Sequence, residues 1–219
     1  MKVVLFGATG MLGQGVLREC LLADDVEQVL VVTRTATGRQ HEKLREIVHH
    51  DFTDFTSIES DLAGLDACFF CLGVSSAGMS EDAYRRITYD VTMAAAEPLV
   101  RLNPRLTFVY VSGAGTNAEG RSMWARVKGA TENALLAMPF NAYMFRPGFI
   151  QPMHGERSRT RLYRVLIAAG RPLFPLVRRL LPKQVTTTEI IGLAMLRVAR
   201  DGAPKRVLES PDITELQRK

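Results

Sequence analysis

Two kinds of hydrophobic pattern alternate along the chain. Short apolar runs that end in glycine or polar residues predict buried strands, and longer stretches with an apolar residue at every third or fourth position predict helices. Strands are predicted within residues 2–10, 26–34, 65–73, 105–115, 141–148 and 205–209, with one more at the end of a helical or loop piece over residues 41–52. Helices are predicted over residues 11–24, 80–102, 121–138 and 186–200, before a polar tail over residues 210–219.

Strands that are apolar on both faces and alternate with helices are typical of a parallel sheet covered by helices on both sides. We therefore predict an α/β fold: a Rossmann-type doubly wound parallel sheet with strand order 3-2-1-4-5-6 and a seventh strand from the C-terminal part. No linker or internal repeat divides the chain, so one domain over residues 1–219 is expected. A small C-terminal helical cap is expected over residues 150–185.

A glycine-rich turn joins the first predicted strand to the first predicted helix. It reads Gly7-Ala8-Thr9-Gly10-Met11-Leu12-Gly13, with the spacing G-x-x-G-x-x-G. The first glycine permits a sharp turn, the second lets the backbone approach a pyrophosphate, and the third lets the helix pack closely on the strand. The helix N-terminus adds free N–H groups and the positive end of its dipole. This context predicts dinucleotide binding, although glycine-rich turns also occur for structural reasons alone.

The end of the second predicted strand indicates which dinucleotide is bound. NAD sites usually place an acid there to bind the ribose 2′-OH, but this chain has Thr33 and Arg34, with Arg39 close behind. An arginine can bind the 2′-phosphate that an acid would repel. We therefore expect NADP(H) rather than NAD(H), the alternative being that Arg34 is a solvated surface residue. Asp51 and Phe52, after the third strand, are placed to flank the adenine.

Five motifs occur in order along nearly the whole chain: "GATGMLG", "CLG", "VYVSGAG", "ARVKGATE" and "FRPG". This ordered set resembles the atypical short-chain dehydrogenase/reductase superfamily. Within it, the chain is most similar to the Tat-interacting-protein-like (CC3-like) NAD(P)-binding oxidoreductases and their bacterial relatives. The glycine turn alone is moderately specific, and the ordered set is much more so.

The resemblance implies roles for particular residues. Ser112 would orient a substrate carbonyl or hydroxyl, and Lys128 would bind the nicotinamide ribose and lower the pKa of a neighbouring tyrosine. With the residues discussed above, the implied cofactor-binding set is Gly7, Thr9, Gly10, Met11, Leu12, Gly13, Thr33, Arg34, Asp51, Phe52, Leu72, Gly73, Lys128, Pro147, Gly148 and Phe149. Leu72 and Gly73 would line the ribose, and the last three would pass the nicotinamide carboxamide.

The chain departs from the family at Trp124, where the catalytic tyrosine is expected. A phenol can donate and accept a proton, whereas an indole N–H only donates a hydrogen bond. General acid–base help is typically worth about a hundred- to ten-thousand-fold in rate. Trp124 is either a packing residue or a ring that roofs the nicotinamide pocket or stacks on a ligand. We keep it with Ser112 and Lys128 as the candidate catalytic residues.

Two interpretations of function follow. The first is a weak or unusual NADP(H)-dependent oxidoreductase that acts on a small carbonyl compound or isomerisable substrate. The second is a non-enzymatic dinucleotide-binding protein, a redox sensor or partner-binding regulator. Ser112 and Lys128 favour the first slightly, because nothing else in the sequence explains why both are present.

The formal net charge of +5 is concentrated in one segment. Residues 153–183 contain eight arginines and lysines against one acid, Glu156, which gives this segment +7 and leaves −2 for the rest. We expect the segment to cap its own domain, the alternatives being a homo-oligomer or protein-partner surface over residues 157–183. A membrane surface is not favoured. Nucleic acid is not expected as a partner, because the remaining surface is slightly acidic and carries no known binding motif.

Cysteine and histidine usage and the N-terminal residues bear on metal binding and localisation. Three cysteines do not form a disulfide framework, and the four histidines show no ligand spacing with them, so no metal site is predicted. No signal peptide and no apolar stretch of membrane-spanning length is visible. A cytoplasmic protein is therefore expected.

Overall fold

A computed structural model describes residues 1–156 and 185–218 of the chain. Its main sheet has the order β3-β2-β1-β4-β5-β6-β9, and every neighbouring pair is parallel. The strands are β1 (Lys2–Phe6), β2 (Gln28–Thr33), β3 (Leu44–Val48), β4 (Ala67–Phe70), β5 (Thr107–Val111), β6 (Asn141–Arg146) and β9 (Val207–Glu209). The predicted strand order and the seventh strand are confirmed. A separate two-stranded parallel sheet pairs β7 (Phe149–Gln151) with β8 (Val185–Thr187).

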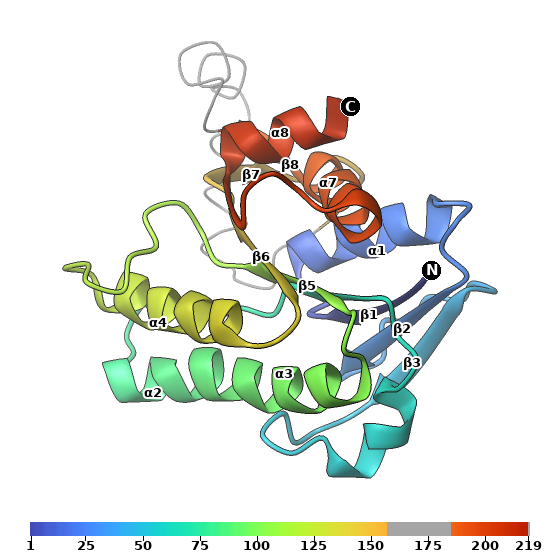
Figure 1. Cartoon of the computed structure of the whole chain (residues 1–219), viewed down its shortest axis with the longest axis horizontal. Helices are drawn as coiled ribbons and strands as arrows, with labels where there is room; N and C mark the ends of the chain where they lie inside the picture. The colour runs from blue at the N-terminus through green and yellow to red at the C-terminus, as the bar shows by residue number, and fades with distance from the viewer. Residues whose placement is uncertain (157–184, 219) are drawn as a thin grey trace.

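Helices cover both faces of the main sheet, so the fold has three layers (Figure 1). One face carries α1 (Met11–Leu22), α7 (Thr188–Asp201) and α8 (Ser210–Arg218). The other carries α4 (Met123–Ala137), the 3₁₀ helix η1 (Thr56–Leu62) and a long helix that comprises α2 (Glu81–Arg85), the π-helical turn η2 (Arg86–Asp90) and α3 (Val91–Leu102). This is the doubly wound arrangement expected from the sequence, with helices α7 and α8 contributed by the C-terminal part.

The central strand β1 shows why its residues are apolar on both faces. Val3 and Leu5 pack into the core cluster beneath α1 and α7. Val4 and Phe6 pack into the cluster on the other face, beneath α3 and α4. All four side chains are fully buried. Because successive side chains of a strand point to opposite faces, a strand covered on both sides needs a continuous apolar run.

Two predicted elements differ in the structure. Within residues 41–52, Leu44–Val48 form the edge strand β3, and no helix forms there. An edge strand is only half buried, so its polar residues Arg45 and Glu46 obscured where the predicted third strand begins. The predicted polar tail forms α8 instead, because the fully buried Ile213 and the partly buried Leu216 anchor an otherwise polar helix to the core.

The predicted cap over residues 150–185 falls largely outside the described residues. At its two ends, Phe149–Gln151 and Val185–Thr187 pair as β7 and β8. The one-domain organisation of residues 1–219 therefore stays a prediction. Within the two described ranges, no helix is both long and apolar enough to cross a membrane.

Candidate functional site

A cleft of about 370 Å³ opens at the carboxyl ends of β1, β2 and β4. In a doubly wound sheet this is where the strand order reverses and where ligands bind. The cleft brings together many of the cofactor-binding residues predicted from the sequence, namely Gly7, Thr9, Gly10, Met11, Leu12, Thr33, Arg34, Phe52, Leu72 and Gly73. The sequence therefore predicted most of its lining.

The glycine turn after β1 leaves no room for side chains at two positions. Gly7 has a φ of +84°, and a Cβ built on it would lie 2.7 Å from the Cys71 backbone at the end of β4. A Cβ on Gly13 would lie 2.1 Å from the Gly7 carbonyl oxygen. Both contacts are far shorter than van der Waals distance, so α1 packs directly on the turn and the turn packs directly on β4.

The N-terminus of α1 faces this turn without a capping side chain. Gly10 is the N-cap residue, it makes no side-chain cap, and the first turn contains no acid. The first N–H groups of a helix have no partner within the helix, and together with the dipole they favour an anion. The cradle formed by the glycines and this helix end therefore fits the pyrophosphate of a dinucleotide.

The rim of the cleft at the end of β2 carries a cation and no acid. Thr33 ends the strand, and its hydroxyl donates to the Thr35 carbonyl over 2.9 Å. Arg34 follows, exposed, and among the residues that the structure describes it has no ion-pair partner. Phe52 forms part of the wall and packs edge-on against Phe6.

Asp51 lies outside the cleft lining. Its carboxylate accepts hydrogen bonds from the Thr53 hydroxyl over 2.5 Å and the Thr53 N–H over 2.9 Å. These two bonds lower the pKa of the Asp51 carboxyl. The side chain closes a local turn, and the adenine contact expected of Asp51 stays a prediction.

Ser112 and Lys128 are brought together beyond the end of β5. The Lys128 ammonium donates to the Ser112 backbone carbonyl. The Ser112 hydroxyl donates to Oε1 of Glu132 over 2.5 Å, with the Phe145 carbonyl 3.3 Å away. Both functional groups therefore have partners inside the protein, and neither residue is among those lining the cleft.

Burial changes the acidity of Lys128. Desolvation of its ammonium lowers its pKa to about 8, and the negative charge of Glu132 partly opposes that change. A lysine with this pKa is mostly protonated at pH 7 and loses its proton in mildly alkaline solution.

Trp124 lies one helical turn before Lys128 on α4. Its ring packs over the loop after β5, where a Cβ built on Gly115 would lie 3.6 Å from the ring. The side chain is partly exposed. Both interpretations of Trp124, packing residue or ligand-facing ring, are compatible with this position.

Pro147, Gly148 and Phe149 continue from β6 beside the same loop. The Ala114 N–H donates to the Pro147 carbonyl over 2.9 Å, and the Gly148 N–H donates to the Ser210 hydroxyl over 2.7 Å. Like Gly13 and Lys128, these three residues are not part of the cleft lining.

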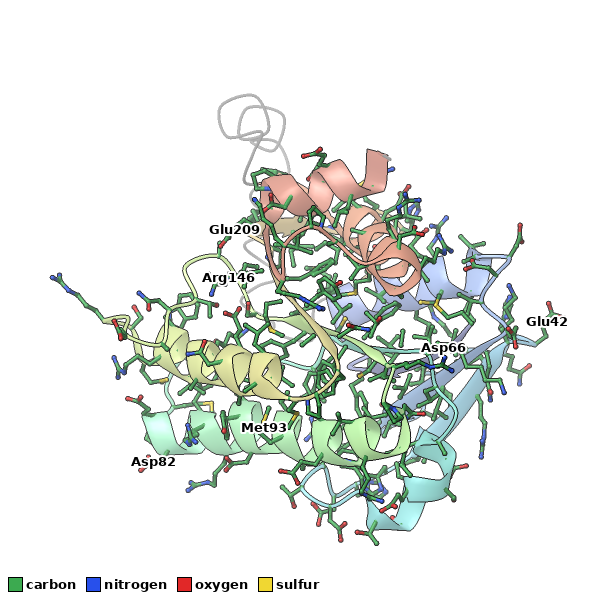
Figure 2. The ribbon with its side chains drawn as sticks, in the orientation of Figure 1. Glu42, Asp66, Asp82, Met93, Arg146 and Glu209 are labelled. Atoms are coloured by element: carbon green, nitrogen blue, oxygen red, sulfur yellow. The ribbon has the colours of Figure 1, made fainter. Side chains whose placement is uncertain are left out.

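A buried ion pair beside Ser112 was missed from the sequence. Glu132, with a 2% exposed side chain, binds Arg146 through Nη2 to Oε2 at 2.5 Å and Nε to Oε1 at 3.0 Å. Arg146 also reaches Glu209 at 3.4 Å, and Figure 2 shows these two side chains close together. The carboxylate of Glu132 raises the pKa of the Arg146 guanidinium. The available signal was an acid in "VKGATE" and an arginine in "FRPG", because charges within predicted buried elements are normally paired.

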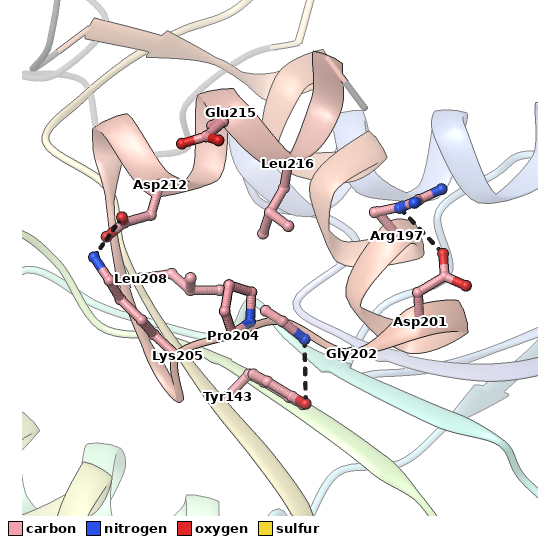
Figure 3. Close-up of a pocket in the computed structure, with 11 residues that line it drawn as sticks. Tyr143, Arg197, Asp201, Gly202, Pro204, Lys205, Leu208, Asp212, Glu215 and Leu216 are labelled. Carbon is pink, nitrogen blue, oxygen red and sulfur yellow. Dashed lines mark hydrogen bonds and ion pairs between the residues drawn. The ribbon is translucent and has the colours of Figure 1, made fainter.

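A second cavity, of about 470 Å³, lies between β6, α7, α8 and the loop that precedes β9 (Figure 3). Because β9 is parallel to the other strands, this loop lies at the amino-terminal edge of the sheet, away from the glycine turn. Arg197 pairs with Asp201 at 3.1 Å on one side, and Lys205 with Asp212 at 2.8 Å on the other. These charges are satisfied by one another, so the cavity is the weaker candidate for a ligand site.

The turn, the helix end and the cleft agree with a comparison to known families. A family model described as NAD(P)H-binding matches residues 7–156. This chain belongs to that NAD(P)H-binding family. The resemblance to atypical short-chain dehydrogenases and reductases is thereby confirmed at the level of the superfamily.

Relatives of this family member occur in fungi. The chain is 29% identical to "Protein FMP52-2, mitochondrial" of Scheffersomyces stipitis, over 76% of this chain and 72% of the relative. It is 25% identical to "Protein fmp52-2, mitochondrial" of Aspergillus oryzae, over 98% of this chain and 96% of the relative. Among solved structures, a short-chain dehydrogenase/reductase family oxidoreductase from Burkholderia thailandensis matches with a TM-score of 0.68 and 18% identity, over 98% and 92% of the two chains. That likeness shows the fold.

The names of the fungal relatives contradict the predicted cytoplasmic localisation, because they place those proteins in mitochondria. The prediction was wrong because it rested on the lack of an apolar secretory signal. Mitochondrial targeting segments are amphipathic and rich in arginine, so the absence of an apolar run says nothing about them.

Proposed function

We propose that this protein binds NADP(H), in preference to NAD(H), in the cleft at the carboxyl ends of β1, β2 and β4. The observation that carries the preference is Arg34, an exposed cation at the rim where NAD sites usually have an acid. A guanidinium can bind a 2′-phosphate with charge-assisted hydrogen bonds. The glycine cradle and the uncapped N-terminus of α1 support binding of the pyrophosphate next to it.

We further propose that the protein is a slow oxidoreductase on a small carbonyl compound. The cofactor supplies or accepts hydride when it is bound. The chain's own contribution is positioning, since the indole of Trp124 does not act as an acid or a base near neutral pH and the Ser112 hydroxyl is held by Glu132. Lys128 is the remaining proton-carrying group at the end of β5, and its pKa of about 8 keeps it charged at neutral pH.

A second candidate is a non-enzymatic dinucleotide-binding sensor or regulator. It is favoured by the internal bonds of Ser112 and Lys128, which give both residues a structural role. The presence of both Ser112 and Lys128 therefore no longer favours catalysis, although in the sequence alone it did. Whether residues 157–183 form an oligomer or partner surface stays a prediction, because they lie outside the described residues.

Calorimetry with NADPH and NADH tests the cofactor preference. Arg34→Ala should weaken NADPH binding by about ten- to a hundred-fold, because it removes a charge-assisted contact, and should leave NADH binding unchanged. Arg45→Ala is the matched control, since Arg45, on the outer strand β3, is also an exposed arginine but pairs with Asp61 of η1. Equal affinity of the native protein for the two cofactors would overturn the preference, and binding of neither would overturn the site.

NADPH oxidation with a panel of aldehydes, ketones and quinones separates the two candidate functions. Slow turnover with any member of the panel supports the oxidoreductase. Tight binding of NADPH without turnover across the panel supports the sensor or regulator.

A further inference from the structure

Four residues from α4, β6 and the loop after β5 meet beyond the end of β5, and together they form what we call the Glu132 clamp: Ser112, Lys128, Glu132 and Arg146. Lys128 and Glu132 lie one turn apart on α4, and Arg146 ends β6. Glu132 and Ser112 are buried. The clamp therefore ties β6 and the loop after β5 to α4, the helix that carries Trp124 and Lys128.

Both oxygens of the Glu132 carboxylate are used inside the clamp. Oε1 accepts from the Ser112 hydroxyl and from Nε of Arg146, and Oε2 accepts from Nη2 of Arg146. A buried carboxylate with this many donors is held in one orientation, because each lost bond would leave a buried polar group without a partner.

Ser112 is in turn fixed at three of its groups. Its N–H donates to the Phe145 carbonyl over 2.9 Å, its hydroxyl donates to Glu132, and its carbonyl accepts from the Lys128 ammonium. The position of that carbonyl decides where the ammonium lies. Glu132 thus acts on Lys128 through Ser112 as well as directly across one helical turn.

We propose that Glu132 is a positioning residue: its carboxylate fixes Ser112, and thereby fixes the carbonyl to which the Lys128 ammonium donates. The inference rests on the proposed function only in that Lys128 is expected to lie beside the nicotinamide ribose. Glu132 would set the geometry and the charge of Lys128 without itself lining the cofactor cleft.

The negative charge of Glu132 also raises the pKa of Lys128. Desolvation lowers the pKa of Lys128. Among the described residues, the charge of Glu132 opposes this decrease. Of the other ionisable groups around the clamp, Arg146 on β6 is paired with Glu132, and Tyr110 on β5 stays neutral because burial raises its pKa. Removal of the carboxylate should therefore make Lys128 lose its proton at lower pH.

Nuclear magnetic resonance of lysine side chains can test this in the cofactor-free protein. The chain has six lysines, so the ¹³Cε and ¹⁵Nζ signals are few, and Lys128→Arg assigns the signal of Lys128. The native protein should show a titration near pH 8. Glu132→Gln should move that titration to lower pH. The matched control is Glu119→Gln, which removes an equal charge from the exposed loop above α4 without touching Ser112.

A second pair of variants covers the case in which Glu132→Gln does not fold. Ser112→Ala removes the hydroxyl but leaves the Glu132–Arg146 ion pair. It should lower the midpoint pH of the Lys128 titration, by less than Glu132→Gln lowers it. Thr116→Val is its control, because it removes from the same loop a hydroxyl that, within the described part of the chain, donates to the Gly113 carbonyl and has no bond to Glu132. The fluorescence of Trp124, the one tryptophan of the chain, should change with the state of Lys128 in the native protein but not in Lys128→Arg.

An unchanged Lys128 titration in both Glu132→Gln and Ser112→Ala overturns the proposal, as does an equal shift in either control. Because no cofactor is needed, these outcomes are independent of the proposed function. Failure of the native protein to bind NADPH would overturn the proposed function and leave the titration result standing.

Discussion

The two halves of the carboxyl edge of the sheet differ in whether their polar groups are available to a ligand. At β1, β2 and β4, the groups that could bind a ligand are left open: an uncapped helix N-terminus, a bare glycine turn and the exposed Arg34. At β5 and β6, the corresponding groups are closed on one another, with Ser112, Lys128, Glu132 and Arg146 all bonded internally. The comparison teaches that binding and chemistry can be separated within one fold, since the open half is equipped to hold a dinucleotide whether or not the closed half catalyses.

The largest expected effect is on the closed half. Glu132→Ala should lower the free energy of unfolding by about 3–5 kcal/mol, because it leaves the mostly buried Arg146 without its principal partner. Chemical denaturation measures the change. Glu119→Ala, at an exposed position, should stay within about 0.5 kcal/mol of the native protein. A small loss in Glu132→Ala would show that Glu209 can replace Glu132 as the partner of Arg146.

On the open half, two glycines of the same turn should respond differently. Gly13→Ala should destabilise the fold by about 3 kcal/mol, since its Cβ would lie 2.1 Å from a backbone oxygen. Gly10→Ala should be much milder, because its Cβ would lie 3.3 Å from the same atom. Thermal melts compare the two. Gly10→Ala should still weaken NADPH binding, and retention of full affinity would argue against a pyrophosphate at this turn.

A new proton donor at position 124 should give the closed half the acid that it lacks. Trp124→Tyr places a phenol one helical turn from Lys128, whose charge should lower the pKa of that phenol. NADPH oxidation should rise by about a hundred-fold if the phenol reaches the substrate. Trp124→Phe is the control, because it changes the ring without adding a proton donor. If the native protein is faster than both variants, the indole has a positive role in substrate binding.

The smallest expected effect concerns pH. As the pH rises from 7 to 9, Lys128 passes through its pKa of about 8 and loses its charge. If its ammonium contacts the bound cofactor, NADPH affinity should fall by about five-fold, the difference between a charged and a neutral donor. Lys128→Arg stays charged throughout and should show a flat profile. A flat profile in the native protein would place Lys128 away from the cofactor.

The lining of the open half was predictable from the sequence, whereas in the closed half Ser112 and Lys128 were predicted but their internal partners were not. Strand order and the glycine turn follow from local signals, namely apolar periodicity and the spacing of Gly7, Gly10 and Gly13. The direction of the Ser112 hydroxyl depends on Glu132, 20 residues later in the chain, and the partner of Glu132 is Arg146 on another strand. Such pairings follow from how distant elements pack, which a linear pattern does not encode. The same limit explains α8, whose helical form depends on burial of Ile213 against the core.

The glycine turn also predicts which of its glycines diverged homologues should retain. Every amino-acid replacement of a glycine adds a Cβ, and at Gly7 and Gly13 that atom collides with backbone whatever the new residue is. At Gly10 the nearest atom is 3.3 Å away, a tight contact that a small shift relieves, so folding constrains that glycine far less than the other two. Descendants that abandon the dinucleotide should therefore lose Gly10 while keeping the other two. A survey of diverged homologues could then separate lineages that still bind the ligand from those that retain only its scaffold.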